Sequence, residues 1–275
     1  MDPLYFLILF GICIFVGTIG VIAGFGGGIF IVPILLIIFE IPIEEAVANS
    51  LVALFLPSIV ATYRNGRQKE VNFKLGLLFE IPTAIGAFIG VSLTVLLPSD
   101  LLEIIFGFLA FLMGSLMVRN YRNQDYQSNT EGKWIKKFSS IGPQMNSNSG
   151  NESFTIGIFA LAITGFFIGI IAGMLGIGCG WITTPLMILG FAIPPRIATA
   201  TATFMIIITS AVGGMTHVFY GHLSLLFIPL TLGLIFGSEI GTRIRTRIHS
   251  DQITQVVIIS LFIIGFIMII TSFIL

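Results

Sequence analysis

The chain has 275 residues and a formal net charge of zero, with 56% hydrophobic and only 9% charged residues. Because a soluble domain has about 25% charged residues, this chain has too few charges to cover a water-facing surface. The composition therefore predicts a protein embedded in a membrane, and the zero net charge gives no indication of nucleic-acid binding.

Each half of the chain contains five apolar segments. In the first half they lie at about residues 4–23, 29–39, 45–63, 73–97 and 101–118. In the second half they lie at about residues 153–174, 181–193, 197–218, 224–242 and 252–274. The longer segments reach or approach the roughly 20 residues that a helix needs to cross a bilayer, whereas the second segment of each half is much shorter. We expect an all-α protein that crosses the membrane several times.

The two halves are copies of one unit, joined by a polar segment. A shift of 152 residues superimposes Gly17 on Gly169, Gly24 on Gly176, Gly26 on Gly178, Gly28 on Gly180 and Pro33 on Pro185. We expect a first membrane repeat over residues 1–118, a linker rich in Asn, Gln, Ser and Lys over residues 119–152, and a second repeat over residues 153–275.

Basic residues predict the orientation, because lysine and arginine mark cytoplasmic loops. In the first half they lie in Arg64–Lys74, but the matching loop of the second half, near Tyr220, has none. The second half has its arginines at Arg196 and within Arg243–Arg247 instead. We expect a cytoplasmic linker, both termini outside the cytoplasm, and two repeats related by inversion, as in many secondary transporters.

Clusters of glycine interrupt both repeats at matched places. The first cluster contains Gly24, Gly26, Gly27 and Gly28, and the second contains Gly176, Gly178, Cys179 and Gly180. Such backbone is tolerated at membrane depth only inside protein or around a watery cavity. We expect the two clusters to meet near the midplane, where each begins a short helix whose free N–H groups bind an anion. The alternative is that the glycines only allow helices to pack closely.

Other polar residues have two interpretations each. Asn49 and Thr201 occupy matched positions, and they either bind oxygens of an anion, together with Ser50, or bond a neighbouring helix. Glu80 lies well inside an apolar segment, where it either carries a proton or is held by a buried partner. Cys179 either contacts substrate or serves as a small packing residue.

The glycine motifs resemble those of a known family. The sequence from Gly169 to Gly180, followed by Pro185, is similar to the signature of the TauE/SafE family of sulfite and organosulfonate exporters. The first cluster, followed by Pro33 and Ala46-Val47-Ala48-Asn49-Ser50, is similar to its first-half copy. The resemblance implies a permease for sulfite, sulfoacetate or a related sulfur anion, with proton coupling as an option. Cys179 stands where the family usually has glycine, and Asn49 where threonine is common.

Two classes of function remain open on the sequence. One is a secondary transporter of a small anion that works by alternating access; the other is a membrane-embedded enzyme or an assembly or scaffold protein. An enzyme would need clustered His, Asp, Glu or Cys at membrane depth, where only Glu80 and Glu239 are candidates. We therefore expect a transporter and no enzyme, without a cofactor or metal, whose partners are a small anion and the lipid bilayer.

Overall fold

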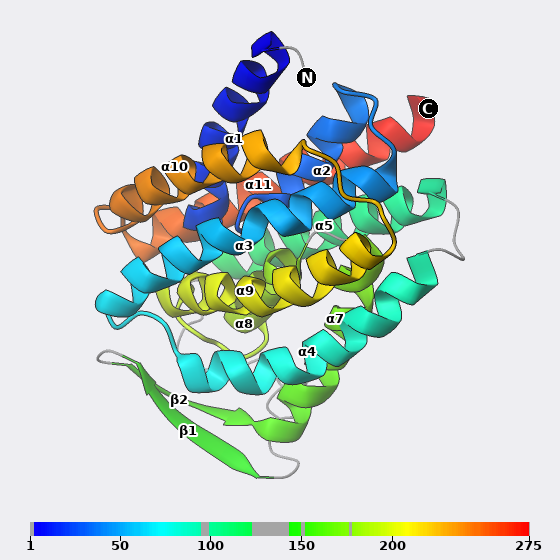
Figure 1. Ribbon diagram of the computed structural model, residues 1–275. Helices are drawn as coiled ribbons and strands as arrows, with labels where there is room; N and C mark the ends of the chain where they lie inside the picture. The colour runs from blue at the N-terminus through cyan, green and yellow to red at the C-terminus, as the bar shows by residue number, and fades with distance from the viewer. Residues whose placement is uncertain (1–2, 95–98, 123–142, 150–151, 176–177, 275) are drawn as a thin grey trace.

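The computed structural model describes residues 3–94, 99–122, 143–149, 152–175 and 178–274. Ten helices lie within these ranges (Figure 1). The first half forms α1 (Pro3–Ala23), α2 (Gly28–Ile37), α3 (Ile43–Arg67), α4 (Phe73–Thr94) and α5 (Ser99–Arg122). The second half forms α7 (Ile158–Leu175), α8 (Gly180–Leu189), α9 (Pro195–Phe219), α10 (Phe227–Arg245) and α11 (Ser250–Ile274). Five helical segments in each half are therefore confirmed.

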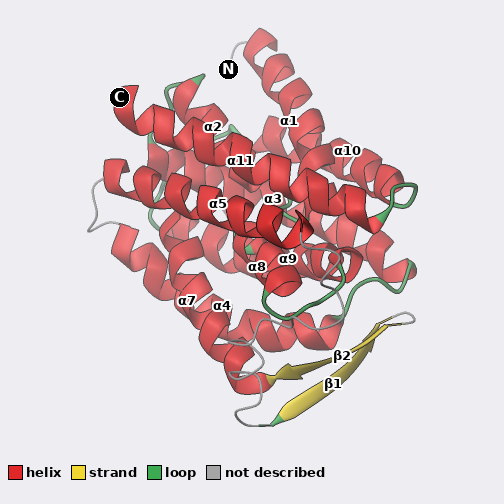
Figure 2. Cartoon of the chain, turned by 180° about the vertical axis from the view of Figure 1, so that it is seen from behind, coloured by secondary structure: helices red, strands yellow, loops and turns green. Residues whose placement is uncertain are grey.

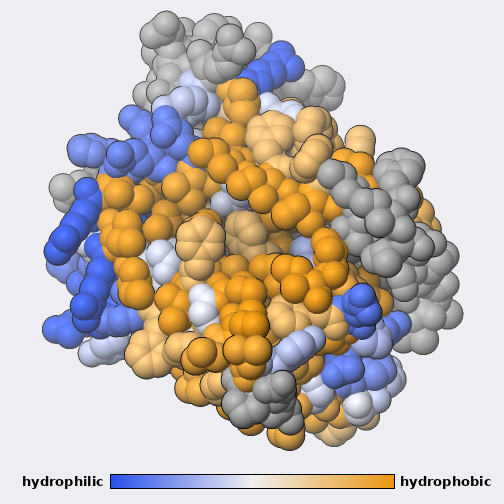
Figure 3. Space-filling view, turned by 90° about the horizontal axis from the view of Figure 1, so that it is seen from above, coloured by the Kyte–Doolittle hydropathy of each residue, from blue (hydrophilic) through white to orange (hydrophobic). Residues whose placement is uncertain are grey.

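Six of these helices are long and apolar enough to cross a membrane. They are α1, α3, α4, α9, α10 and α11. Large hydrophobic side chains such as Phe15, Phe88 and Phe266 are exposed on them, and Figure 3 shows a broad hydrophobic area on one face of the molecule. In water such an area would be costly, whereas lipid tails cover it without cost. The chain is a multi-pass membrane protein.

A two-stranded antiparallel sheet, which the sequence analysis did not predict, spans the end of the linker and the start of the second repeat. Strands β1 (Gln144–Ser149) and β2 (Glu152–Gly157) form it, and Met145 pairs with Ile156, both of them buried (Figure 2). The apolar segment expected from residue 153 therefore begins as a strand, and α7 starts only at Ile158. The alternation of Phe154 and Ile156 with polar residues was the signal for a strand. Most of the linker, residues 123–142, lies outside the described residues.

The first helix of each half packs against the fourth helix of the other half, parallel to it. A Cβ atom added at Gly86 of α4 would lie 2.1 Å from the carbonyl oxygen of Phe166 in α7. At the matched Gly237 of α10, an added Cβ would lie 2.4 Å from the carbonyl oxygen of Ile14 in α1. Both contacts are too close for any side chain, so these glycines bring the helix backbones together. The third helices, α3 and α9, and the fifth, α5 and α11, pack against each other.

One end of the helix bundle gathers the arginines, and we call it the basic end. Arg64 at the end of α3 pairs with Glu239 of α10, and Arg196 at the start of α9 pairs with Glu70 in the α3–α4 loop. The ends of α3 and α10 accordingly lie together in Figure 1. Helices α3 and α10 run toward the basic end, whereas α4 and α9 start from it. Matched helices α3 and α9, and α4 and α10, therefore run in opposite directions.

Helices α1 and α2 form a hairpin that returns toward its starting point. The rings of Tyr5, in the first turn of α1, and Phe39, just after α2, are 4.7 Å apart at their centroids. Helix α2 therefore runs back to the end of the bundle from which α1 began, opposite the basic end. Figure 1 shows the two chain termini on this same side. The turn between α1 and α2 is the first glycine cluster, inside the protein.

Candidate anion-binding site

The two glycine clusters lie against each other inside the bundle. We call Gly24–Gly27 the first glycine loop, and Gly178 with Cys179 the second glycine loop, which leads into α8 at Gly180. A Cβ atom at Gly180 would lie 2.6 Å from the carbonyl oxygen of Gly24. The hydroxyl of Thr184, one turn along α8, points to the same oxygen at 3.5 Å. All of these residues are buried, and Gly176 lies outside the described residues.

Both loops need glycine because of their backbone angles. The φ angles are +80° at Gly24, +70° at Gly26, +106° at Gly27 and +80° at Gly178. Residues with side chains rarely adopt these left-handed conformations, which glycine reaches without steric cost. The glycine clusters therefore interrupt the helical conformation between α1 and α2, and between α7 and α8, as the sequence predicted.

Only part of the first glycine loop has free backbone donors. The N–H group of Gly24 donates to the carbonyl of Val21, and those of Phe25 and Gly26 both donate to the carbonyl of Gly20. The sequence analysis had expected Gly24 and Gly26 to offer their N–H groups to an anion, but both N–H groups are already bonded to carbonyls of α1. The last turn of α1 uses these donors to satisfy its own end.

The free donors are the first N–H groups of the two short helices. No partner within the described chain accepts from the N–H groups of Gly27, Gly28 and Ile29 at the start of α2, or from that of Gly180 at the start of α8. Neither helix has a side-chain cap. Such helix starts attract negative charge, because their unpaired N–H groups and the helix dipole both point outward.

Two apolar side chains at matched positions pack against both loops. A Cβ atom at Gly26 would lie 3.1 Å from Cδ1 of Ile206 and 3.2 Å from Cδ2 of Leu54. The other loop has the same neighbours, since Gly178 faces Leu54 and Gly180 faces Ile206. Leu54 and Ile206 differ in number by 152, so each occupies the matched place in its repeat. The sequence analysis missed both, although this shift was the signal that could have found them.

The predicted polar ligands lie on the same helices but are partly engaged elsewhere. Asn49 donates to the carbonyl of Glu45 at 2.7 Å and to the hydroxyl of Ser224 at 3.1 Å. The hydroxyl of Thr201 accepts from the backbone N–H of Asn72 at 3.1 Å. The hydroxyl of Ser50 and Oδ1 of Asn49 are buried and have no partner among the described residues. Ser50 lies one turn before Leu54, so it shares the face of α3 that meets the glycine loops.

Glu80 lies directly beside the second glycine loop. Its side chain is fully buried, and the thiol of Cys179 donates to Oε2 at 3.5 Å. The hydroxyl of Thr209 lies 3.3 Å from the same sulfur. Oε1 of Glu80 has no partner within the described residues, and none of their ion pairs includes it. Cys179 is therefore a contact between a buried carboxyl group and the start of α8.

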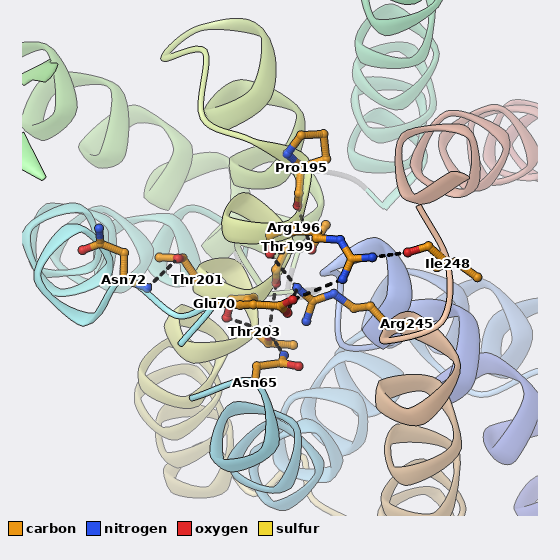
Figure 4. Close-up of polar contacts among 11 residues, drawn as sticks. Asn65, Glu70, Asn72, Pro195, Arg196, Thr199, Thr201, Thr203, Arg245 and Ile248 are labelled. Atoms are coloured by element: carbon orange, nitrogen blue, oxygen red, sulfur yellow. Dashed lines mark hydrogen bonds and ion pairs between the residues drawn. The ribbon is translucent and has the colours of Figure 1, made fainter. Parts of the chain in front are cut away.

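A cluster of two arginines and one glutamate lies at the basic end (Figure 4). Glu70 pairs with Arg196 at 3.2 Å and with Arg245 at 2.9 Å. The sequence analysis expected Arg243–Arg247 on the cytoplasmic side and did not distinguish buried from exposed arginines; the Arg245 side chain is only 1% exposed, in contrast to 68% for Arg243. Residues two apart on a helix face nearly opposite sides, so Arg245 points into the bundle.

Comparison with known proteins agrees with this architecture. Residues 9–268 match the family model described as Sulfite exporter TauE/SafE. The chain is 28% identical over 268 residues to the probable membrane transporter protein YunE of Bacillus subtilis, covering 94% of this chain and 96% of that protein. It is 28% identical over 246 residues to the probable membrane transporter protein YdhB of the same organism, covering 87% and 89%.

A shorter match comes from a plant protein. Sulfite exporter TauE/SafE family protein 3 of Arabidopsis thaliana is 35% identical over 91 residues, which cover 33% of this chain and 18% of that protein. No solved structure is significantly similar to this chain. The family model nevertheless spans nearly all ten helices, including both glycine loops. The chain therefore belongs to the TauE/SafE family of membrane transporters.

Proposed function

We propose that this protein is a secondary transporter of a small sulfur-containing anion, such as sulfite or an organosulfonate like sulfoacetate. The observation that carries the proposal is the close approach of the two glycine loops, each followed by a short helix with free N–H groups. Membership in a family described as sulfite exporters supports the class of substrate.

The substrate would lie between the starts of α2 and α8. Its oxygens would accept from the N–H groups of Gly27, Gly28 and Gly180, assisted by the unpaired hydroxyl of Ser50. Donors from two helix ends suit a singly or doubly charged oxyanion, which supplies several strong acceptors. Leu54 and Ile206 now fill the space beside the loops, so binding would require them to change rotamer or move apart.

The two halves would exchange access to this site as inverted repeats. Matched helices run in opposite directions relative to the basic end, and the contacts between α1 and α10 mirror those between α7 and α4. Two similar halves of opposite orientation exchange conformations at equal cost, which gives alternating access. The basic end would face the cytoplasm by the positive-inside rule, with both termini outside.

Glu80 would couple transport to protons. Its carboxyl group touches Cys179 at the start of α8 and has no cationic partner among the described ion pairs. A buried carboxyl at this place gains or loses a proton more readily when the neighbouring helix start binds or releases an anion. Protonation of Glu80 and binding of the anion would thus be coupled.

Transport and binding by the purified protein test this proposal. Proteoliposomes that contain the protein would be loaded with sulfite, thiosulfate, sulfoacetate, taurine or sulfate, and efflux would be followed over time. We expect at least one sulfur anion to leave faster than from protein-free liposomes, and thermal stabilisation by the same anion. Absence of both effects for every member of the panel would contradict the proposal.

A further inference from the structure

Arg245 has hydrogen-bond donors that no described residue uses. Its Nη2 atom donates to the carbonyl oxygen of Arg196 at 2.5 Å and forms an ion pair with Oε2 of Glu70 at 2.9 Å, without hydrogen-bond geometry. Its Nε and Nη1 atoms are buried and have no partner among the described residues. A guanidinium remains charged at any physiological pH, so two buried donors of a charged group are left without an acceptor. Buried donors without an acceptor are rare in proteins, and a bound ion is one explanation for them.

The charges around Arg245 favour an anion as the missing partner. Arg196 places Nη1 3.2 Å from Oε1 of Glu70 and uses Nη2 to bind the carbonyl of Ile248. One carboxylate therefore serves two guanidinium groups, and the cluster carries an excess of one positive charge. Figure 4 shows these three side chains pointing toward one another from α9, α10 and the α3–α4 loop. Water would satisfy the hydrogen bonds but would leave the excess charge unbalanced.

The cluster is next to the first glycine loop. A Cβ atom at Gly24 would lie 2.7 Å from Cα of Thr199, which is three residues after Arg196 on α9. Three residues correspond to about 4.5 Å along a helix axis. Both the arginine cluster and the glycine loop therefore touch the first two turns of α9. An anion that leaves the glycine loops toward the basic end meets these guanidinium groups next.

We propose that the guanidinium group of Arg245 is a second binding site for the transported oxyanion, on its way to the basic end. The unpaired Nε–H and Nη1–H each lie parallel to an N–H of Nη2, so either pair matches two oxygens of a sulfite or sulfonate group, a geometry that lysine lacks. Glu70 competes with the anion for Nη2, so arrival of the anion loosens Glu70 from Arg245. Because Glu70 ties the α3–α4 loop to the second repeat, this exchange opens the basic end. The inference rests on the proposed function.

Titration of sulfite into purified protein in lipid nanodiscs tests this site. Arg245→Lys keeps the charge but loses the two-pronged geometry, and we expect its affinity to fall roughly tenfold. Glu70→Gln removes the competing carboxylate, and we expect affinity to rise severalfold. Arg243→Lys is the matched control, since Arg243 lies two residues away on the same helix and is exposed. Its affinity should equal that of the wild type.

The outcomes separate this inference from the proposed function. If the wild type binds sulfite while Arg245→Lys and Glu70→Gln bind it equally well, the second site is wrong and the proposed function stands. If the wild type binds no anion of the panel, the proposed function and this inference both fail. Should Arg245→Lys not fold, Glu70→Gln alone decides, because an unchanged or lower affinity in that variant contradicts competition by the carboxylate.

Discussion

The side-chain amide of Asn49 donates a hydrogen bond to the hydroxyl of Ser224, 3.1 Å away, although the two residues are 175 positions apart. The shift of 152 residues matches Asn49 to Thr201 and Ser224 to Asn72. These two residues make the corresponding contact, in which the backbone N–H of Asn72 donates to the hydroxyl of Thr201 at 3.1 Å. Each pair joins the first turns of a third helix to the loop before the fourth helix of the other half. The two pairs lie toward opposite ends of the bundle, because α3 and α9 start from opposite ends.

The first prediction concerns the hydrogen bond between Asn49 and Ser224. Ser224→Ala should lower the free energy of unfolding by about 1 kcal/mol, because it removes one part-buried hydrogen bond, and Asn49→Ala should lower it by about 2 kcal/mol, because it also removes the bond to Glu45. The double variant should be less destabilised than the sum, since both changes remove the same bond. Denaturation of the detergent-solubilised variants measures this. Additive losses would mean that the two side chains do not interact.

The second prediction concerns the backbone of the second glycine loop. Gly178 has a φ of +80° and nearly open space around its missing side chain, with Leu54 3.9 Å away. Gly178→Ala should therefore strain the loop by about 1–2 kcal/mol and move the start of α8. We expect sulfite binding to be lost while the protein still folds. Gly11→Ala is the control, because nothing lies within 4 Å of its added Cβ atom.

The third prediction concerns proton coupling. Glu80→Gln keeps the size of the side chain and its contact with Cys179 but is unable to exchange a proton. We expect this variant to bind the anion and to transport it at a rate that an imposed proton gradient no longer changes. Cys179→Ser, which keeps a hydrogen-bond donor, should retain the response to the gradient. A Glu80→Gln variant that still responds to the gradient would show that protons take another route.

The fourth prediction concerns orientation in the membrane. In a background without Cys13 and Cys179, cysteine is introduced either at Lys69 or at Tyr220, both exposed at opposite ends of the bundle. We expect a membrane-impermeant thiol reagent to label residue 220 in intact cells, and residue 69 only after the cells are opened. The reverse pattern would place the basic end outside.

The fifth prediction concerns the contact between the repeats. An added Cβ atom at Gly86 would lie 2.1 Å from a backbone carbonyl of α7, so Gly86→Val must push α4 and α7 apart. The loss of packing should lower the thermal stability by several degrees or prevent folding. Gly237→Val should have the same effect between α10 and α1, and Gly11→Val should have little effect. Normal stability of both interface variants would exclude this packing.

The sequence by itself determined the helical segments, the duplication and the glycine breaks. Runs of apolar residues of bilayer length have no other stable structure in lipid, because every backbone polar group must be bonded within its own helix. The matched glycines are likewise found from the sequence alone, by shifting it against itself by 152 residues. The hairpin was missed because β1 lies in the polar linker and β2 was assigned to the apolar segment that continues into α7.

Only the tertiary structure decided which of these residues keep free donors and which side chains are buried. Gly24 and Gly26 belong to the predicted cluster, yet their N–H groups turn back to α1, while the donors of Gly27 and Gly28 stay free. The burial of Arg245 depends on which side of α10 meets α9 and the α3–α4 loop. Such contacts join residues far apart in the sequence, and their geometry depends on how the helices pack, which local sequence patterns do not specify.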